Sequence, residues 1–209
     1  CFENLPGSAT VLATLNGVPC GFSAVVGKGL LIALGFNLID KFDYYVPIME
    51  QLMAELGVKK SVTLSGRDLV AVLRANDKQG FLFAGNFHEI DCEDQAELSL
   101  GGERLVLDLN LRQRCGVILP LNLELPQSGT LKYATCEVLA VKRKGQKLEL
   151  DLYAPCVKGF ELGFSGLEIL KARLSAGKAE LRRTDQGWIV AAKIDSGINP
   201  EMKLTLQIK

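Results

Sequence analysis

Short runs in which hydrophobic and polar residues alternate dominate the chain after Lys60. Ser61–Ser65 alternates with a period of two. The same rhythm recurs in seven later segments: Leu69–Arg74, Gly80–Asn86, Gln95–Leu100, Arg104–Leu111, Gly116–Pro120, Lys132–Val141 and Lys147–Tyr153. Turn-forming pairs such as Asn76-Asp77 and Gly101-Gly102 separate these segments. Many short strands at near-regular spacing predict a β-sandwich or Greek-key barrel over 61–157.

The alternation continues beyond Pro155. Four further strands are predicted there: Glu168–Arg173, Lys178–Arg183, Gly187–Lys193 and Met202–Ile208. A unit of only about fifty residues is marginal as an independent domain. We therefore expect 158–209 to be a small C-terminal β unit that packs on the sandwich.

The first sixty residues have a different character. Ala9–Leu15 is typical of a strand, and Asn16-Gly17 is a type I′ hairpin signal that returns the chain through Cys20–Val26. A tight turn then leads into Leu30–Gly35, a continuous apolar run. Such a run predicts a central strand buried on both faces of an α/β sheet.

A helix is predicted over Asp40–Leu56, where apolar residues recur every three or four positions. Pro47 favours a start near Tyr45 or Val46, and Gly57 favours an end directly after Leu56. One helix and three strands leave one face of the sheet uncovered, which requires a partner. The predicted fold is mainly β: β-sandwich domains preceded by a short α/β segment over 1–60.

Composition narrows the function classes. The 209 residues carry 24 basic and 24 acidic side chains, and this balance argues against a nucleic-acid partner. The most apolar stretch, Leu30–Phe36, is far shorter than the roughly 20 residues that span a bilayer, so no membrane partner is expected. Position 1 is not Met and no signal peptide follows, so the chain is expected to begin inside a larger protein or to be trimmed. Six scattered cysteines without a C-x₂-C pair favour buried thiols and a cytoplasmic setting.

No motif specifies a reaction. His88 has no nucleophile motif beside it, and we expect a solvated or structural side chain. The acidic residues between Glu89 and Glu97 lack the spacing of a calcium loop, and no catalytic, cofactor-binding or metal-binding residue is assigned. Three aromatic residues are candidate sugar contacts: Trp188, Tyr133 and Tyr153. A lone Trp in a strand is more often part of a core.

Several strands together resemble a known family. Gly80–His88, with the sequence GFLFAGNFH, resembles a strand that follows the catalytic barrel in family 35 and related β-galactosidases. Val117–Leu125, Leu131–Leu139 and Leu148–Tyr153 resemble the next strands of that region in order and spacing. The resemblance covers Leu69–Tyr153. The strands and helix within 1–60 are similar to the end of the glutamine-amidotransferase-like domain that mediates oligomerisation in several β-galactosidases.

This resemblance implies a parent enzyme, a retaining glycoside hydrolase of carbohydrate metabolism whose two catalytic glutamates lie in an upstream (β/α)₈ barrel. None of those glutamates corresponds to a residue of this chain. The chain is then expected to be a non-catalytic C-terminal accessory region that supports the barrel and contributes to a homo-oligomer, without a cofactor. Two alternatives remain: a carbohydrate-binding β-sandwich module that uses Trp188, Tyr133 or Tyr153, and a stand-alone interaction protein.

Overall fold

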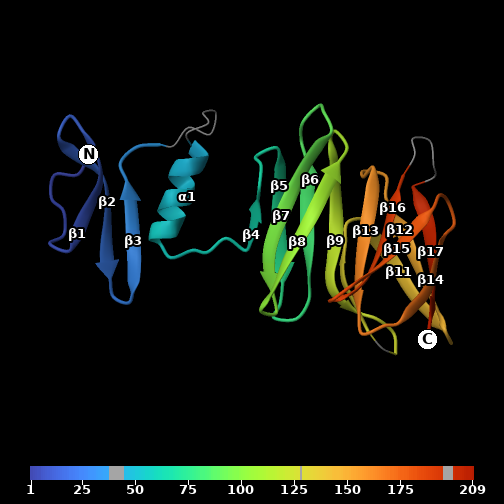
Figure 1. Ribbon diagram of the computed structural model, residues 1–209. Helices are drawn as coiled ribbons and strands as arrows, with labels where there is room; N and C mark the ends of the chain where they lie inside the picture. The colour runs from blue at the N-terminus through green and yellow to red at the C-terminus, as the bar shows by residue number, and fades with distance from the viewer. Residues whose placement is uncertain (38–44, 128, 195–199) are drawn as a thin grey trace. The chain divides into compact units, whose positions relative to one another are not determined.

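The computed structural model describes residues 1–37, 45–127, 129–194 and 200–209. These residues form two compact units, Cys1–Lys60 and Ser61–Lys209. Antiparallel sheets make up most of both, and α1 (Tyr45–Glu55) is the one helix of the described residues (Figure 1). The predicted fold class, mainly β with sandwich architecture, is confirmed. In the part of the chain that is described, no helix is long and apolar enough to span a membrane.

The N-terminal unit holds a three-stranded antiparallel sheet in the order β1 (Ala9–Leu15), β2 (Val18–Val26), β3 (Gly29–Leu34). Asn16 and Gly17 join the first two strands with φ values of 51° and 80°. Both residues are left-handed, as a type I′ turn requires, so the predicted hairpin is confirmed.

The prediction of a central strand buried on both faces is wrong for Leu30–Gly35. Within the described residues β3 pairs with β2 alone and forms an edge of the sheet, and its first three residues are exposed. The turn at Gly27 pairs β3 with β2 as a hairpin, and among the described residues no further strand pairs with the other side of β3. An apolar run alone does not distinguish these two placements.

The described part of the helix begins at Tyr45, and Pro47 lies in its first turn, where a missing N–H costs no hydrogen bond. The predicted residues before Tyr45 lie outside the described ones. Gly57 ends the helix with a φ of 72°. The N–H of Val58 donates to the carbonyl of Met53, and the N–H of Gly57 to that of Ala54, both at 2.9 Å. This pair of bonds is a Schellman motif, which confirms the predicted stop.

Three antiparallel sheets build the C-terminal unit. The seven-stranded sheet has the order β15 (Ala179–Thr184), β16 (Gly187–Lys193), β13 (Gly159–Ser165), β10 (Thr130–Ala134), β9 (Cys115–Glu124), β6 (Gly80–Asn86), β5 (Leu69–Ala75). The four-stranded sheet has the order β11 (Glu137–Lys144), β12 (Lys147–Tyr153), β17 (Glu201–Ile208), β14 (Ile169–Leu174). The three-stranded sheet has the order β4 (Val62–Leu64), β7 (Cys92–Leu100), β8 (Glu103–Leu111).

One hydrophobic core joins these three sheets. Inward-facing residues alternate with outward-facing ones along strands such as β6, β8 and β12, and Leu82, Leu107 and Leu150 are fully buried representatives of the three sheets. The strands within 158–209 belong to the seven-stranded and four-stranded sheets, so they share this core with the strands before them. Burial of apolar surface between the sheets is the main stabilising contribution to such a unit.

Two strand predictions need correction. Lys132–Val141 is not one strand but parts of β10 and β11, which belong to different sheets. Thr135 and Cys136 are buried one after the other at the crossing, which interrupts the alternation that a single strand needs. The sequence analysis also missed β13, because two glycines, Gly159 and Gly163, weaken its strand pattern.

Candidate functional site

Trp188 lies on the seven-stranded sheet beside the core. In β16 it pairs with Phe164 of β13 and with Arg183 of β15. The guanidinium carbon of Arg183 lies 5.5 Å from the centroid of the Trp188 ring, within range of a cation–π contact. The indole is half-buried and packs against the hydrophobic core. Core packing therefore accounts for much of its surface.

Tyr133 lies in β10 over a glycine. Its partner in β13 is Gly163, and a Cβ atom on that glycine would come within 2.4 Å of Cε1 of the Tyr133 ring. Burial raises the pKa of Tyr133 to about 12, and the nearby charge of Glu161 adds to the shift. The phenol consequently stays protonated at neutral pH. One face of its ring is used by packing on Gly163.

Tyr153 is half-buried in β12 of the four-stranded sheet, where it pairs with Glu137 and Glu201. Trp188 and Phe164 are paired residues, so their side chains lie on the same face of the seven-stranded sheet. Tyr133 covers Gly163, the residue before Phe164, and the Cβ position of Gly163 points to the opposite face. The three candidate sugar contacts thus lie on two sheets and on different faces. The structure does not bring them together as one stacking platform.

His88 is exposed in the turn after β6, and a buried asparagine holds that turn. The side-chain amide of Asn86 donates to the carbonyls of Ile90, Leu111 and Arg112 at 2.7, 3.2 and 3.1 Å. Its carbonyl oxygen accepts from the N–H of His88 at 2.9 Å. Asn86 is 1% exposed. The signal in the sequence is a polar residue at an inward position of the alternating strand 80–86.

The acidic residues after His88 serve the fold. The carboxylate of Asp91 pairs with Lys158 at 3.0 Å, and this contact together with the N–H of Gln113 lowers the pKa of Asp91. Burial opposes ionisation of Asp94, but hydrogen bonds from Ser65, Gly66 and Gln95 lower its pKa. No group of three or more potential metal ligands is found within the described ranges.

Cys136 and Cys156 are poorly disposed to act as nucleophiles. Burial strongly raises the pKa of the Cys136 thiol. Burial also raises the pKa of Cys156 to about 12, and the adjacent thiol of Cys115 contributes through a hydrogen bond. A thiol with such a raised pKa is protonated at neutral pH, and the thiolate is the reactive form.

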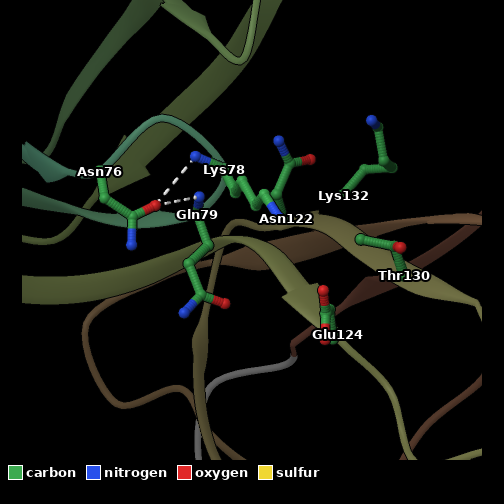
Figure 2. A pocket seen from close by; sticks show the side chains of 7 residues that line it. All are labelled: Asn76, Lys78, Gln79, Asn122, Glu124, Thr130 and Lys132. Carbon is green, nitrogen blue, oxygen red and sulfur yellow. Dashed lines mark hydrogen bonds between the residues drawn. The ribbon is translucent and has the colours of Figure 1, made fainter.

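A polar cavity of about 320 Å³ lies where three segments of the C-terminal unit meet. The β5–β6 turn contributes Asn76, Lys78 and Gln79, whereas the ends of β9 and β10 contribute Asn122, Glu124, Thr130 and Lys132. Figure 2 shows these side chains, all of them polar, projecting from separate segments of the sheet. The sequence analysis missed this site because its residues carry no local motif.

A second feature is an apolar outer face on the seven-stranded sheet, on the side opposite the core. It consists of Val70, Val72, Phe81, Phe83 and Ile118, all between 41% and 53% exposed. Val72, Phe83 and Ile118 face one another across β5, β6 and β9. Adjacent inward residues such as Leu82 and Leu119 are fully buried. These three strands are therefore apolar on both faces.

Comparison with known proteins gives a single broad link. The chain matches no protein-family model. It is 28% identical over 85 residues, 41% of its length, to a beta-1,2-glucosyltransferase of Ignavibacterium album. The matched stretch spans 12% of that enzyme, far less than its whole length. The similarity connects the chain to a carbohydrate-active enzyme.

Proposed function

We propose that the chain is a non-catalytic C-terminal region of a β-galactosidase-like carbohydrate-active enzyme, where it supports a catalytic (β/α)₈ barrel. Two lines of reasoning support the proposal. The strands between Leu69 and Tyr153 resemble, in order, those that follow the barrel in family 35 β-galactosidases. The similarity to a beta-1,2-glucosyltransferase also connects the chain to carbohydrate chemistry.

The observation that carries this proposal is the apolar outer face. An antiparallel sheet with one face on a core ordinarily turns polar residues to water on the other. Here the row formed by Val72, Phe83 and Ile118 turns aromatic and branched side chains outward instead. Contiguous apolar patches of this kind mark interaction sites. Two of the five residues of the apolar outer face lie in β6, and β6 is also the first of the strands that resemble the β-galactosidases. We therefore propose that the barrel of the same enzyme covers this face.

The N-terminal unit offers a second apolar surface. A cavity of about 370 Å³ beside α1 is lined by Val46, Met49, Met53 and Val58 together with a few polar residues. Lys60 pairs with Glu50, another lining residue, at 2.7 Å. Because this unit resembles the end of an oligomerising domain, we propose that the surface contributes to contacts between subunits of the parent enzyme.

An activity comparison tests the assignment. The full-length parent protein is expected to release p-nitrophenol from p-nitrophenyl β-galactoside or β-glucoside, whereas the 209-residue chain alone is expected to give no turnover above the uncatalysed rate. Turnover by the chain alone would place catalytic residues inside it and overturn the non-catalytic role. A parent protein inactive on both substrates and on β-1,2-linked glucans would overturn the carbohydrate-active assignment.

A further inference from the structure

We propose that the polar cavity between the β5–β6 turn and the ends of β9 and β10 binds a neutral sugar unit. Its volume of about 320 Å³ lies at the lower end of the range of roughly 300–1,000 Å³ for small-molecule sites. The site is separate from Trp188, Tyr133 and Tyr153, none of which lines it. This inference rests on the proposed function only for the choice of sugars in the test.

Several polar groups that line the cavity have no partner among the described residues of the protein. Within the described part of the chain, the Lys78 ammonium, the Glu124 carboxylate and the Thr130 hydroxyl have no hydrogen-bond or ion-pair partner. The side-chain oxygen of Asn122 is buried and also without a partner. Buried polar groups are normally hydrogen-bonded, and an unpaired one requires an explanation. Lys78 and Glu124 are exposed, so their charged groups are available to a ligand that brings both donors and acceptors.

The backbone holds these groups in place. The side-chain oxygen of Asn76 accepts from the N–H groups of Lys78 and Gln79, each at 2.9 Å, which fixes the β5–β6 turn (Figure 2). Asn122 has a φ of 51° inside β9, a left-handed conformation that is uncommon for a residue other than glycine. Thr130 pairs directly with Glu124 across β9 and β10.

The charges favour a neutral ligand. Lys78 and Lys132 lie on the cavity, but Lys132 forms an ion pair with Glu103, and Glu124 balances Lys78. The remaining groups are a carboxylate, an ammonium, amides and a hydroxyl, a mixture of donors and acceptors that matches the paired hydroxyls of a sugar ring. No aromatic side chain lines the cavity, so stacking does not contribute. We therefore expect weak affinity, with a Kd on the order of 1 mM.

An amide-shift titration of the isotope-labelled 209-residue chain tests this site. We expect galactose, or a glucose disaccharide with a β-1,2 linkage, to shift the amide signals of Gln79, Asn122 and Thr130 saturably by about 50 mM. Glu124→Gln is expected to weaken binding at least about fivefold, as loss of a charged hydrogen bond predicts. Glu149→Gln, on β12 of the other sheet, is the matched control and is expected to leave the Kd unchanged.

Three outcomes would overturn the site: no saturable shift with either sugar, shifts centred away from the cavity, or a Kd that Glu124→Gln does not change. Because the titration reads binding by the chain itself, it is independent of the activity of any parent enzyme. A negative titration beside an active parent would refute the cavity alone. A positive titration beside an inactive parent would refute the proposed function and leave the cavity.

Discussion

Replacing Asn86 by Leu is expected to lower the free energy of unfolding of the C-terminal unit by about 3–5 kcal/mol. The substitution keeps the branching at Cγ, replaces the amide by two bulkier methyl groups and removes every hydrogen bond of the amide. Three backbone carbonyls and the N–H of His88 then lose their partner in a region where Asn86 is 1% exposed. Each orphaned buried group costs about 1–3 kcal/mol, partly relieved by movement of the turn.

Urea unfolding followed by circular dichroism measures this loss, with Asn76→Ala as the matched control. Asn76 also holds a turn through its side-chain oxygen, but its two bonds are exposed, so water can replace them. We expect the control to cost about 1 kcal/mol. Equal losses for the two variants would show that Asn86 has no special structural role.

Replacing Gly187 by Ala is expected to cost about 3–4 kcal/mol. Gly187 begins β16 after a two-residue turn and has a φ of 138°, a conformation that side chains with a Cβ rarely adopt. A Cβ atom there would lie 2.0 Å from the carbonyl oxygen of Phe164. The obstacle is backbone, which cannot rotate away as a flexible side chain does. Either the turn or β13 must move.

Gly145→Ala provides the control, because Gly145 is also left-handed, with a φ of 58°, but nothing lies within 4 Å of its Cβ position. Only the backbone penalty of about 1–2 kcal/mol applies there. Thermal unfolding of both variants compares the two losses. A Gly187→Ala variant no less stable than Gly145→Ala would refute the close approach of β16 to the carbonyl of Phe164.

Periodicity and turn residues were sufficient to predict most of the fold. The alternating segments became strands, and the hairpin at Asn16-Gly17 and the helix end at Gly57 formed as local chemistry requires. The fold predictions were wrong where the position of a strand depends on residues far away in the sequence. The apolar run of β3 is an edge because no further strand pairs with it among the described residues, and β13 has a glycine at position 163 because the ring of Tyr133 covers it.

The candidate site was less predictable than the fold. Residue type alone singled out Trp188, Tyr133 and Tyr153, but neighbouring strands set their faces and separate them. The polar cavity instead combines a turn near residue 78 with strand ends near residues 122 and 130. Sheet order brings those segments together, and single-sequence patterns do not contain sheet order. The apolar outer face was not predicted for the same reason, because in the sequence alone Phe81 and Phe83 fit the pattern of an ordinary strand.

Docking of the apolar outer face on the proposed catalytic barrel is best examined with Phe83→Gln in the full-length protein. Phe83 is 41% exposed in the chain, so the variant is expected to change the stability of the chain alone by less than about 1 kcal/mol. Leu139→Gln, on β11 of the four-stranded sheet and 61% exposed, is the matched control.

Differential scanning calorimetry of the parent and of the isolated chain provides the measurement. We expect Phe83→Gln to lower the midpoint of the barrel transition by several degrees, because a polar group then faces an apolar interface, whereas Leu139→Gln leaves it unchanged. A barrel transition that Phe83→Gln does not move, in an enzyme that still unfolds cooperatively, would contradict docking through this face.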